Sequence, residues 1–208
     1  MTFGSIAFPA GRGLALAASL LFAFSAWAQP PAKLRRQTLT AQLSAMLPAD
    51  FQVMPDDAIA TKYPAPRKPL AAYTSPSGQV DFVVSQKSTP FKAGDLAVLL
   101  RFYKSNILNL YGDNVQFSQE QVVTINDTEF IALEFTSALT GGKSTTPKPA
   151  AQRSNLRRYT YLLYTIQPPK TEKEVPQLLS FTFSCPTVLA ETWKPVAQQV
   201  MTSIKIKK

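Results

Sequence analysis

Two apolar runs decide the fold, Tyr159-Thr-Tyr-Leu-Leu-Tyr-Thr-Ile166 and Leu178-Leu-Ser-Phe-Thr-Phe-Ser-Cys185. In the second run, Leu179, Phe181 and Phe183 alternate with small polar residues, which is the period of a strand with one buried face. The first run is apolar or aromatic on both faces, as in a strand that is covered on both sides. The polar, proline-containing segment between the runs predicts a turn. We therefore expect a hairpin at the middle of a mostly antiparallel sheet.

The segments before this hairpin predict more strands and one long helix. Residues 70–85 and 115–136 each hold two strand-like runs joined by a short turn, and each predicts a hairpin. Between them, apolar residues recur every three or four positions over 96–111, with Asp95 as the expected N-cap and Gly112 as the expected end. Because helices do not alternate singly with strands, this order predicts an α+β fold, a mostly antiparallel sheet with helices packed on it.

Shorter elements are predicted at both ends of this order. Residues 39–47 predict a short helix, 51–54 a strand, and 55–63 a helix of one or two turns. Residues 186–201 predict one helix, or two helices broken at Pro195, before an extended end.

The first 28 residues have the features of a secretory signal peptide. Arg12 supplies the positive charge, residues 14–24 are an apolar run too short to span a bilayer, and Ala26-Trp27-Ala28 is a cleavage motif. A retained membrane anchor is the alternative. The prediction is therefore cleavage after residue 28 and a periplasmic or secreted protein.

Cleavage would leave 180 of the 208 residues, enough for one domain. We expect residues 29–47 to form an N-terminal arm with the short helix, and residues 48–208 to form a single domain. Because only Arg12 is charged in the signal, the remaining chain has 21 Lys and Arg, 13 acids and a net charge of +8. Outside the cytoplasm, this charge favours lipid headgroups, acidic polysaccharide or an acidic protein as partners over nucleic acid.

The composition excludes several classes of active site. With no histidine and one cysteine, Cys185, the chain forms no Ser-His-Asp triad, no usual zinc site and no internal disulfide. Gly142-Lys143-Ser144 lacks the first glycine of a phosphate-binding loop. Glu129 and Glu134 are an odd number of positions apart on one strand, so they lie on opposite faces and cannot act as a pair. We expect Cys185 to be a buried small hydrophobe, with a reactive thiol as the alternative.

Several short motifs, together with the order of elements over residues 48–208, resemble the PsbP-like superfamily, which includes DcrB-like envelope proteins. The motifs are Lys62-Tyr63-Pro64, Phe181-Thr-Phe-Ser-Cys-Pro186, Trp193 and Met201-Thr-Ser-Ile-Lys205. The resemblance implies an α/β/α sandwich and a binding or assembly role rather than an enzyme. It offers no shared catalytic residue to carry over, and it does not explain the linker at 140–155.

Positive charge supplies the candidate site. No acid occurs between Phe135 and Thr171, and the candidate basic residues in this interval are Lys143, Lys148, Arg153, Arg157 and Arg158. We predict that they form an edge that binds an anion or a partner, with the two arginines at a strand start as its rigid base. The alternative is a solvated loop with no binding role.

The leading hypothesis is a secreted, non-enzymatic binding or assembly protein of the bacterial envelope. It would engage a protein or an anionic glycolipid through the basic edge, without nucleic acid, cofactor or metal, and without a transmembrane segment after signal cleavage. One alternative is a carrier that holds a small apolar ligand between sheet and helix. The other is a hydrolase that uses carboxylates alone.

Overall fold

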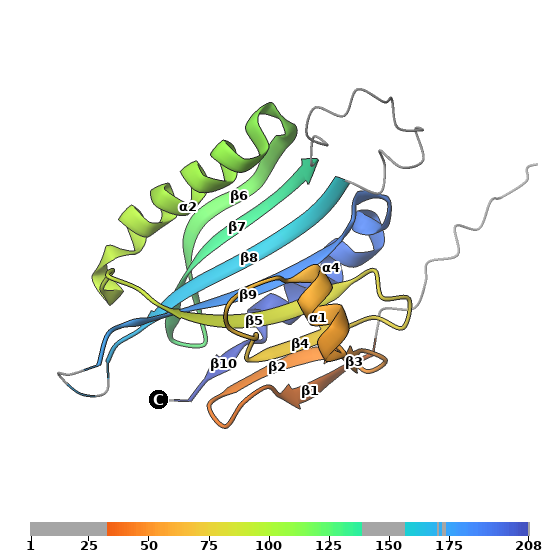
Figure 1. Cartoon of the computed structure of the whole chain (residues 1–208), viewed down its shortest axis with the longest axis horizontal. Helices are drawn as coiled ribbons and strands as arrows, with labels where there is room; N and C mark the ends of the chain where they lie inside the picture. Colours follow the sequence, from red (N-terminus) through yellow and green to blue (C-terminus); the bar gives the residue numbers. More distant parts are fainter. Residues whose placement is uncertain (1–32, 139–156, 170, 172–173, 208) are drawn as a thin grey trace, which may run out of the picture. The chain divides into compact units, whose positions relative to one another are not determined.

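A seven-stranded sheet carries the fold in the part of the chain that the computed structural model describes, residues 33–138, 157–169, 171 and 174–207 (Figure 1). The spatial order is β3-β4-β5-β9-β8-β7-β6, and every neighbouring pair is antiparallel. The strands are β3 (Gln52–Val53), β4 (Ala71–Thr74), β5 (Asp81–Ser88), β6 (Val115–Ile125), β7 (Thr128–Ala138), β8 (Arg157–Gln167) and β9 (Gln177–Pro186). Because β9 is the middle strand and β8 its neighbour, the predicted central hairpin is confirmed.

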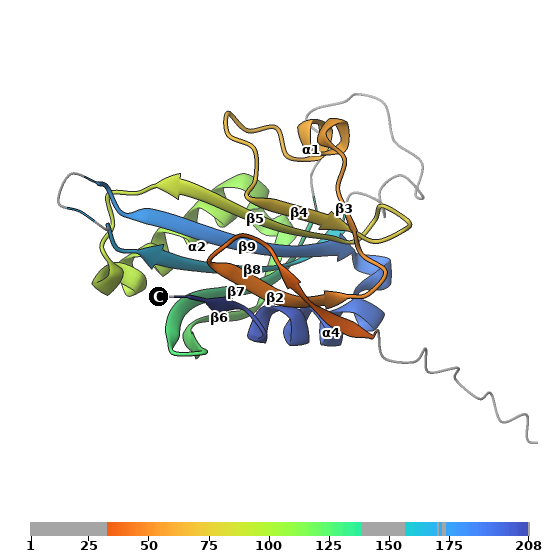
Figure 2. The same ribbon diagram turned by 90° about the horizontal axis from the view of Figure 1, so that it is seen from below.

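Both faces of this sheet are covered, as Figure 2 shows with α1 on one side and α4 on the other. One face carries α1 (Asp56–Lys62) and α2 (Leu96–Tyr111). The other carries α4 (Ala190–Thr202) and a small sheet in the order β1-β2-β10. The small sheet consists of β1 (Leu34–Thr38), β2 (Leu43–Pro48) and β10 (Lys205–Ile206). The α+β class with helices on both faces of the sheet is therefore confirmed.

Strand alternation divides the core between the two faces. In β8, Tyr161 and Leu163 point to the α4 side, whereas Leu162 and Ile166 point to α2. The helices place their predicted apolar stripes against these faces. Their contributions are Leu96, Leu99 and Ile107 of α2, and Ala197, Val200 and Met201 of α4.

The turns match the sequence prediction with one exception. The β6–β7 hairpin turns at Asn126 and Asp127, which have φ values of 46° and 60°, and α2 ends at Gly112, with φ 55°. Asp95 is the N-cap residue of α2, as predicted, but its side chain makes no capping hydrogen bond to this helix. A 3-10 turn (η1, Ala93–Asp95) precedes α2, and the Asp95 carboxylate accepts the backbone N–H of Lys92 at 2.7 Å. The carboxylate points back into that turn instead of capping α2.

The short helix predicted for residues 39–47 is wrong, because this region is a β-hairpin. Leu43, Ala45 and Leu47 are buried at alternate positions of β2. β2 also pairs with β10 near the C-terminal end, where Lys205 lies opposite Ser44. This partner is about 160 positions away in sequence, so local helix periodicity could not indicate it.

The remaining predictions concern helices and the termini. The strand at β3 and the helix at α1 are confirmed, and α4 continues through Pro195 rather than breaking there. Among the described residues, no helix is long and apolar enough to cross a membrane. Residues 1–28 and the linker at 140–155 lie outside the described residues.

Candidate functional site

Helices α1 and α2 leave a cleft of about 650 Å³ between them on their side of the sheet. Its walls are the C-terminal end of α1 and the last turns of α2, and its floor is formed by β5, β9, β8 and β7. The lining residues are Lys62, Tyr63, Gly78, Gln79, Asp81, Ile107, Leu110, Tyr111, Phe135, Arg158, Thr160, Leu162, Thr182, Ser184 and Pro186.

Strand register arranges the cleft floor as a row across the sheet. Asp81 lies opposite Ser184, Ser184 opposite Thr160, and Thr160 opposite Phe135. Residues directly opposite one another in antiparallel strands share a face. Along this row, the floor carries a carboxylate on β5, hydroxyl groups on β9 and β8, and an aromatic ring on β7.

Asp81 is the buried centre of the charged end, with only 2% of its surface exposed. Its carboxylate accepts hydrogen bonds from Lys62 Nζ at 3.0 and 3.1 Å, Tyr63 Oη at 3.0 Å and Thr74 Oγ1 at 2.6 Å. A buried carboxylate requires such donors, because its desolvation is otherwise costly. Lys62 is the last residue of α1 and Tyr63 is its C-cap, so this network also links the end of α1 to the sheet.

Arg158 reaches the same end of the cleft from β8. Its Nη2 donates to Ser184 Oγ at 2.9 Å and to the carbonyl of Gln79 at 3.4 Å, and lies 4.0 Å from Asp81 Oδ2. This last separation is too long for a hydrogen bond. The cleft is thus lined by two cations and one acid, and that acid is hydrogen-bonded by Lys62 rather than by Arg158.

Burial, and then the negative charge of Asp81, raise the pKa of the Tyr63 hydroxyl. The hydroxyl therefore stays protonated and donates to the carboxylate at neutral pH. The opposite end of the cleft is apolar and carries Ile107, Leu110 and Phe135. Leu110 is 67% exposed, so an apolar surface remains open to solvent there.

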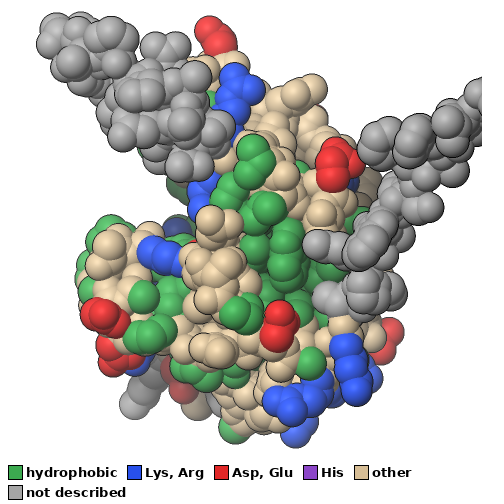
Figure 3. Space-filling view, turned by 90° about the vertical axis from the view of Figure 1, so that its right-hand side faces the viewer, with side chains coloured by type: hydrophobic (Ala, Val, Ile, Leu, Met, Phe, Trp, Pro, Cys, Tyr) green, Lys and Arg blue, Asp and Glu red, His purple; other side chains and the backbone are tan. Residues whose placement is uncertain are grey.

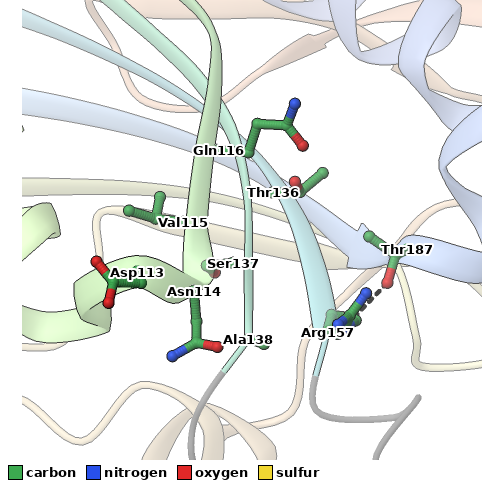
Figure 4. Close-up of a pocket in the computed structure, with 9 residues that line it drawn as sticks. All are labelled: Asp113, Asn114, Val115, Gln116, Thr136, Ser137, Ala138, Arg157 and Thr187. Atoms are coloured by element: carbon green, nitrogen blue, oxygen red, sulfur yellow. Dashed lines mark hydrogen bonds between the residues drawn. The ribbon is translucent and has the colours of Figure 1, made fainter.

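A second, smaller pocket of about 210 Å³ lies at the same end of the sheet (Figure 4). It lies between the segment 113–116, the end of β7 and Arg157 of β8. Thr187 Oγ1 donates to the carbonyl of Arg157 at 3.1 Å, which fixes the backbone at the start of β8. Figure 3 views this end of the molecule, where hydrophobic side chains gather in the middle and Lys and Arg side chains lie around them.

The structure places two of the five predicted site residues. Arg157 is exposed, and Arg158 is partly buried in the cleft. Because neighbouring residues of a strand point to opposite faces, the two guanidinium groups start from opposite sides of the sheet. Lys143, Lys148 and Arg153 lie outside the described residues.

Sequence reasoning missed Lys62 and Asp81 as site residues. In the sequence, Lys62 stands out only as part of a family motif, and Asp81 is one residue of a predicted strand with no role assigned to it. The available signal was an acid inside an otherwise apolar strand, Gln79-Val-Asp-Phe-Val-Val84. An acid in such a place is rarely buried without a partner.

Glu134 is the other acid that is buried among the described residues, and it lies on the far side of the sheet from Asp81. Its side chain is 3% exposed and lies 3.0 Å from Lys194 Nζ of α4. Burial, followed by the Glu134 charge, raises the pKa of neighbouring Tyr159. Since the sheet separates Asp81 from Glu134, these two buried acids do not face a common cleft.

Cys185 is fully buried on the α4 side, as predicted for a small hydrophobe. Burial raises the pKa of its thiol to about 11, and the positive charge of Arg158 opposes this shift. The thiol is therefore protonated at neutral pH and is a poor nucleophile.

Comparison with protein-family models finds no match, and comparison with curated proteins finds none either. Comparison with solved structures finds similar folds. The cyanobacterial PsbP of Synechocystis sp. PCC 6803 is 12% identical, with a TM-score of 0.54, over 84% of this chain and 93% of that one. LpqN of Mycobacterium tuberculosis, described as involved in cell envelope biogenesis, is 12% identical, with a TM-score of 0.53, over 85% of this chain and 91% of that one. The chain therefore has the PsbP-like fold that its motifs implied.

Proposed function

We propose that the protein is a secreted, non-enzymatic binding or assembly protein of the bacterial envelope. It engages a protein or an anionic glycolipid through the basic end of β8, formed by Arg157, Arg158 and the preceding basic segment with Lys143, Lys148 and Arg153. The observation that carries this proposal is the position of Arg158. It stands in an open cleft beside a carboxylate that Lys62 already neutralises.

Two further facts support this proposal. Arg157 is exposed at the same strand start, so the two arginines present positive charge from both faces of the sheet at one end. The fold is shared with LpqN, whose description places that protein in envelope biogenesis. We infer the same cellular location for this chain from its signal-like first 28 residues.

Recruitment to the envelope tests the proposal. The full-length chain, expressed in bacteria and purified, is incubated with envelope extract at low and high salt, and the bound protein is quantified. We expect Arg157→Glu to reduce recruitment strongly at low salt, and high salt to release the wild-type chain, because both remove attraction to an acidic partner.

Arg101→Glu is the matched control. Arg101 is exposed on α2, so this variant makes the same change in net charge away from the start of β8. Recruitment should remain near the wild-type level in this variant. Equal loss in both variants would show that total charge matters and not the basic end of β8, and no loss in Arg157→Glu would refute the proposal.

A second candidate function is the carriage of a small ligand between sheet and helix. It is favoured by the cleft between α1 and α2, whose volume of about 650 Å³ lies within the range of small-molecule sites. A carboxylate-only hydrolase has no such support, because Asp81 and Glu134 are on opposite sides of the sheet.

A further inference from the structure

We propose that the cleft between α1 and α2 binds an amphipathic anion, a carboxylate or phosphate group joined to an apolar tail. The inference rests on the second candidate function and names its ligand class. The charged group would lie at Arg158, and the tail would lie along Ile107, Leu110 and Phe135 toward the end of α2. A neutral apolar ligand would leave the charged end of the cleft without a partner.

The charged end of the cleft favours an anion over a cation. Lys62 and Arg158 face a single acid, Asp81, so the lining has an excess of one positive charge. Asp81 already accepts hydrogen bonds from Lys62, Tyr63 and Thr74. A cationic ligand would have to displace one of these donors, whereas an anion can approach Arg158, whose side chain is 37% exposed.

Hydroxyl groups extend this end of the cleft. Ser184, Thr160 and Thr182 line the floor next to Arg158. Ser184 Oγ accepts a hydrogen bond from Arg158 and is also hydrogen-bonded to the Tyr63 hydroxyl. A guanidinium group with neighbouring hydroxyls is suited to carboxylate or phosphate oxygens, and charge-assisted bonds of this kind are stronger than neutral ones.

The other end of the cleft suits a short apolar tail. Phe135 is 3% exposed and Leu162 is 9% exposed, so the floor is fixed by the core beneath α2. Leu110, by contrast, is 67% exposed, and this exposed leucine of α2 borders the cleft. Covering its surface with a ligand tail would remove apolar area from water at roughly 25 cal/mol per Å².

A set of decyl compounds separates the contributions of head and tail. Binding of decanoate, decyl phosphate, decanol and decyltrimethylammonium to the full-length chain is measured by calorimetry and by chemical-shift changes in NMR spectra. We expect decanoate or decyl phosphate to bind at least about tenfold more tightly than decanol, as one charge-assisted hydrogen bond predicts. The two anionic arms distinguish a fatty-acid carboxylate from a lipid phosphate.

Variants locate the two ends of the ligand. Arg158→Met keeps a long apolar stem and should remove the preference for the anion, while Arg101→Met on the exposed face of α2 should not. Leu110→Ser should weaken the anion and decanol alike, by about threefold. Leu108→Ser is its control, because Leu108 is 41% exposed on α2 but does not line the cleft. Thermal unfolding of each variant verifies that it is folded.

Three results would overturn the inference. They are equal binding of decanol and the anions, an anion preference that survives in Arg158→Met, and the absence of binding by every decyl compound. Both proposals use Arg158, so recruitment to the envelope is measured separately with Arg157→Glu, a residue that does not line the cleft. If Arg157→Glu loses recruitment but still binds the anion, recruitment depends on a residue that the anion does not need.

Discussion

At the scale of single residues, Cys185 illustrates how burial controls reactivity. Its thiol is fully buried in β9, and its pKa is raised to about 11. At pH 8 we expect the native chain to react with Ellman's reagent at least about a hundredfold more slowly than the chain in urea, because thiolate is scarce and access is blocked. The native rate should rise as pH increases toward 11. Equally fast reaction in both states would contradict this placement.

The ion pair between Glu134 and Lys194 is the second prediction at this scale. The carboxylate is 3% exposed, whereas the ammonium group is 45% exposed. Lys194→Met should therefore destabilise the protein by about 2 kcal/mol, because it leaves the buried Glu134 charge without its counterion. The loss is moderate because water reaches the position of the lysine ammonium group and screens the pair. Denaturation in urea measures this loss. Adding Glu134→Gln should recover part of it, because the uncompensated charge is then removed.

The exposed pair between Lys104 of α2 and Glu120 of β6 is the control for this prediction. Its atoms are 2.6 Å apart, but the two side chains are 38% and 43% exposed. We expect Lys104→Met to cost less than about 1 kcal/mol, because exposed pairs contribute little. A similar cost in Lys104→Met and Lys194→Met would show that the burial of Glu134 is not the cause.

At the scale of elements, the β6–β7 turn offers a stabilising change. Asp127 has φ 60°, a conformation that glycine adopts without cost and in which Asn-Gly is the preferred turn pair. Asp127→Gly should raise the free energy of unfolding by about 0.5 kcal/mol. Asn126→Gly should not, because Asn126 Nδ2 donates to the carbonyl of Ile204 at 2.8 Å. Unfolding in urea distinguishes the two variants.

Local patterns were sufficient for most elements of this chain. The stripe of α2 and the alternation of β9 appear in short windows, and both were predicted correctly. Residues 39–47, which form the turn and most of β2, were predicted as a helix, because Leu39, Leu43 and Leu47 also recur at a helical spacing. Pairing with β10 decides between the two patterns, and this contact joins the two ends of the domain.

At the scale of the whole molecule, the same limit applies to the candidate site. Lys62, Asp81 and Arg158 come from α1, β5 and β8, and nothing in their sequence separation predicts that they meet. The register of the sheet brings them together, since Asp81 lies opposite Ser184 and Ser184 opposite Thr160. Sequence reasoning named Arg158 from its charge and its place at a strand start, and it could not foresee the cleft or the buried acid beside it.

The pairing of β2 with both β1 and β10 makes a final prediction about the domain boundary. Leu43, Ala45 and Leu47 are buried in the core on the α4 side, with exposures of 3%, 0% and 0%. A chain that begins at residue 48 should therefore be insoluble or largely unfolded, because it exposes that core and leaves β10 without a partner. A chain that begins at residue 33 retains both strands and should unfold at the same urea concentration as one that begins at residue 29.

Solubility, circular dichroism and urea unfolding of the three chains measure this difference. The comparison between the starts at 33 and 48 is decisive, because the two chains differ only by β1, the turn after it and β2 up to Leu47. If the chain that begins at 48 folds with unchanged stability, residues 29–47 are a dispensable arm, as the sequence pattern indicated. If it does not fold, the domain begins with β1, and its first hairpin and last strand close the α4 side of the core together.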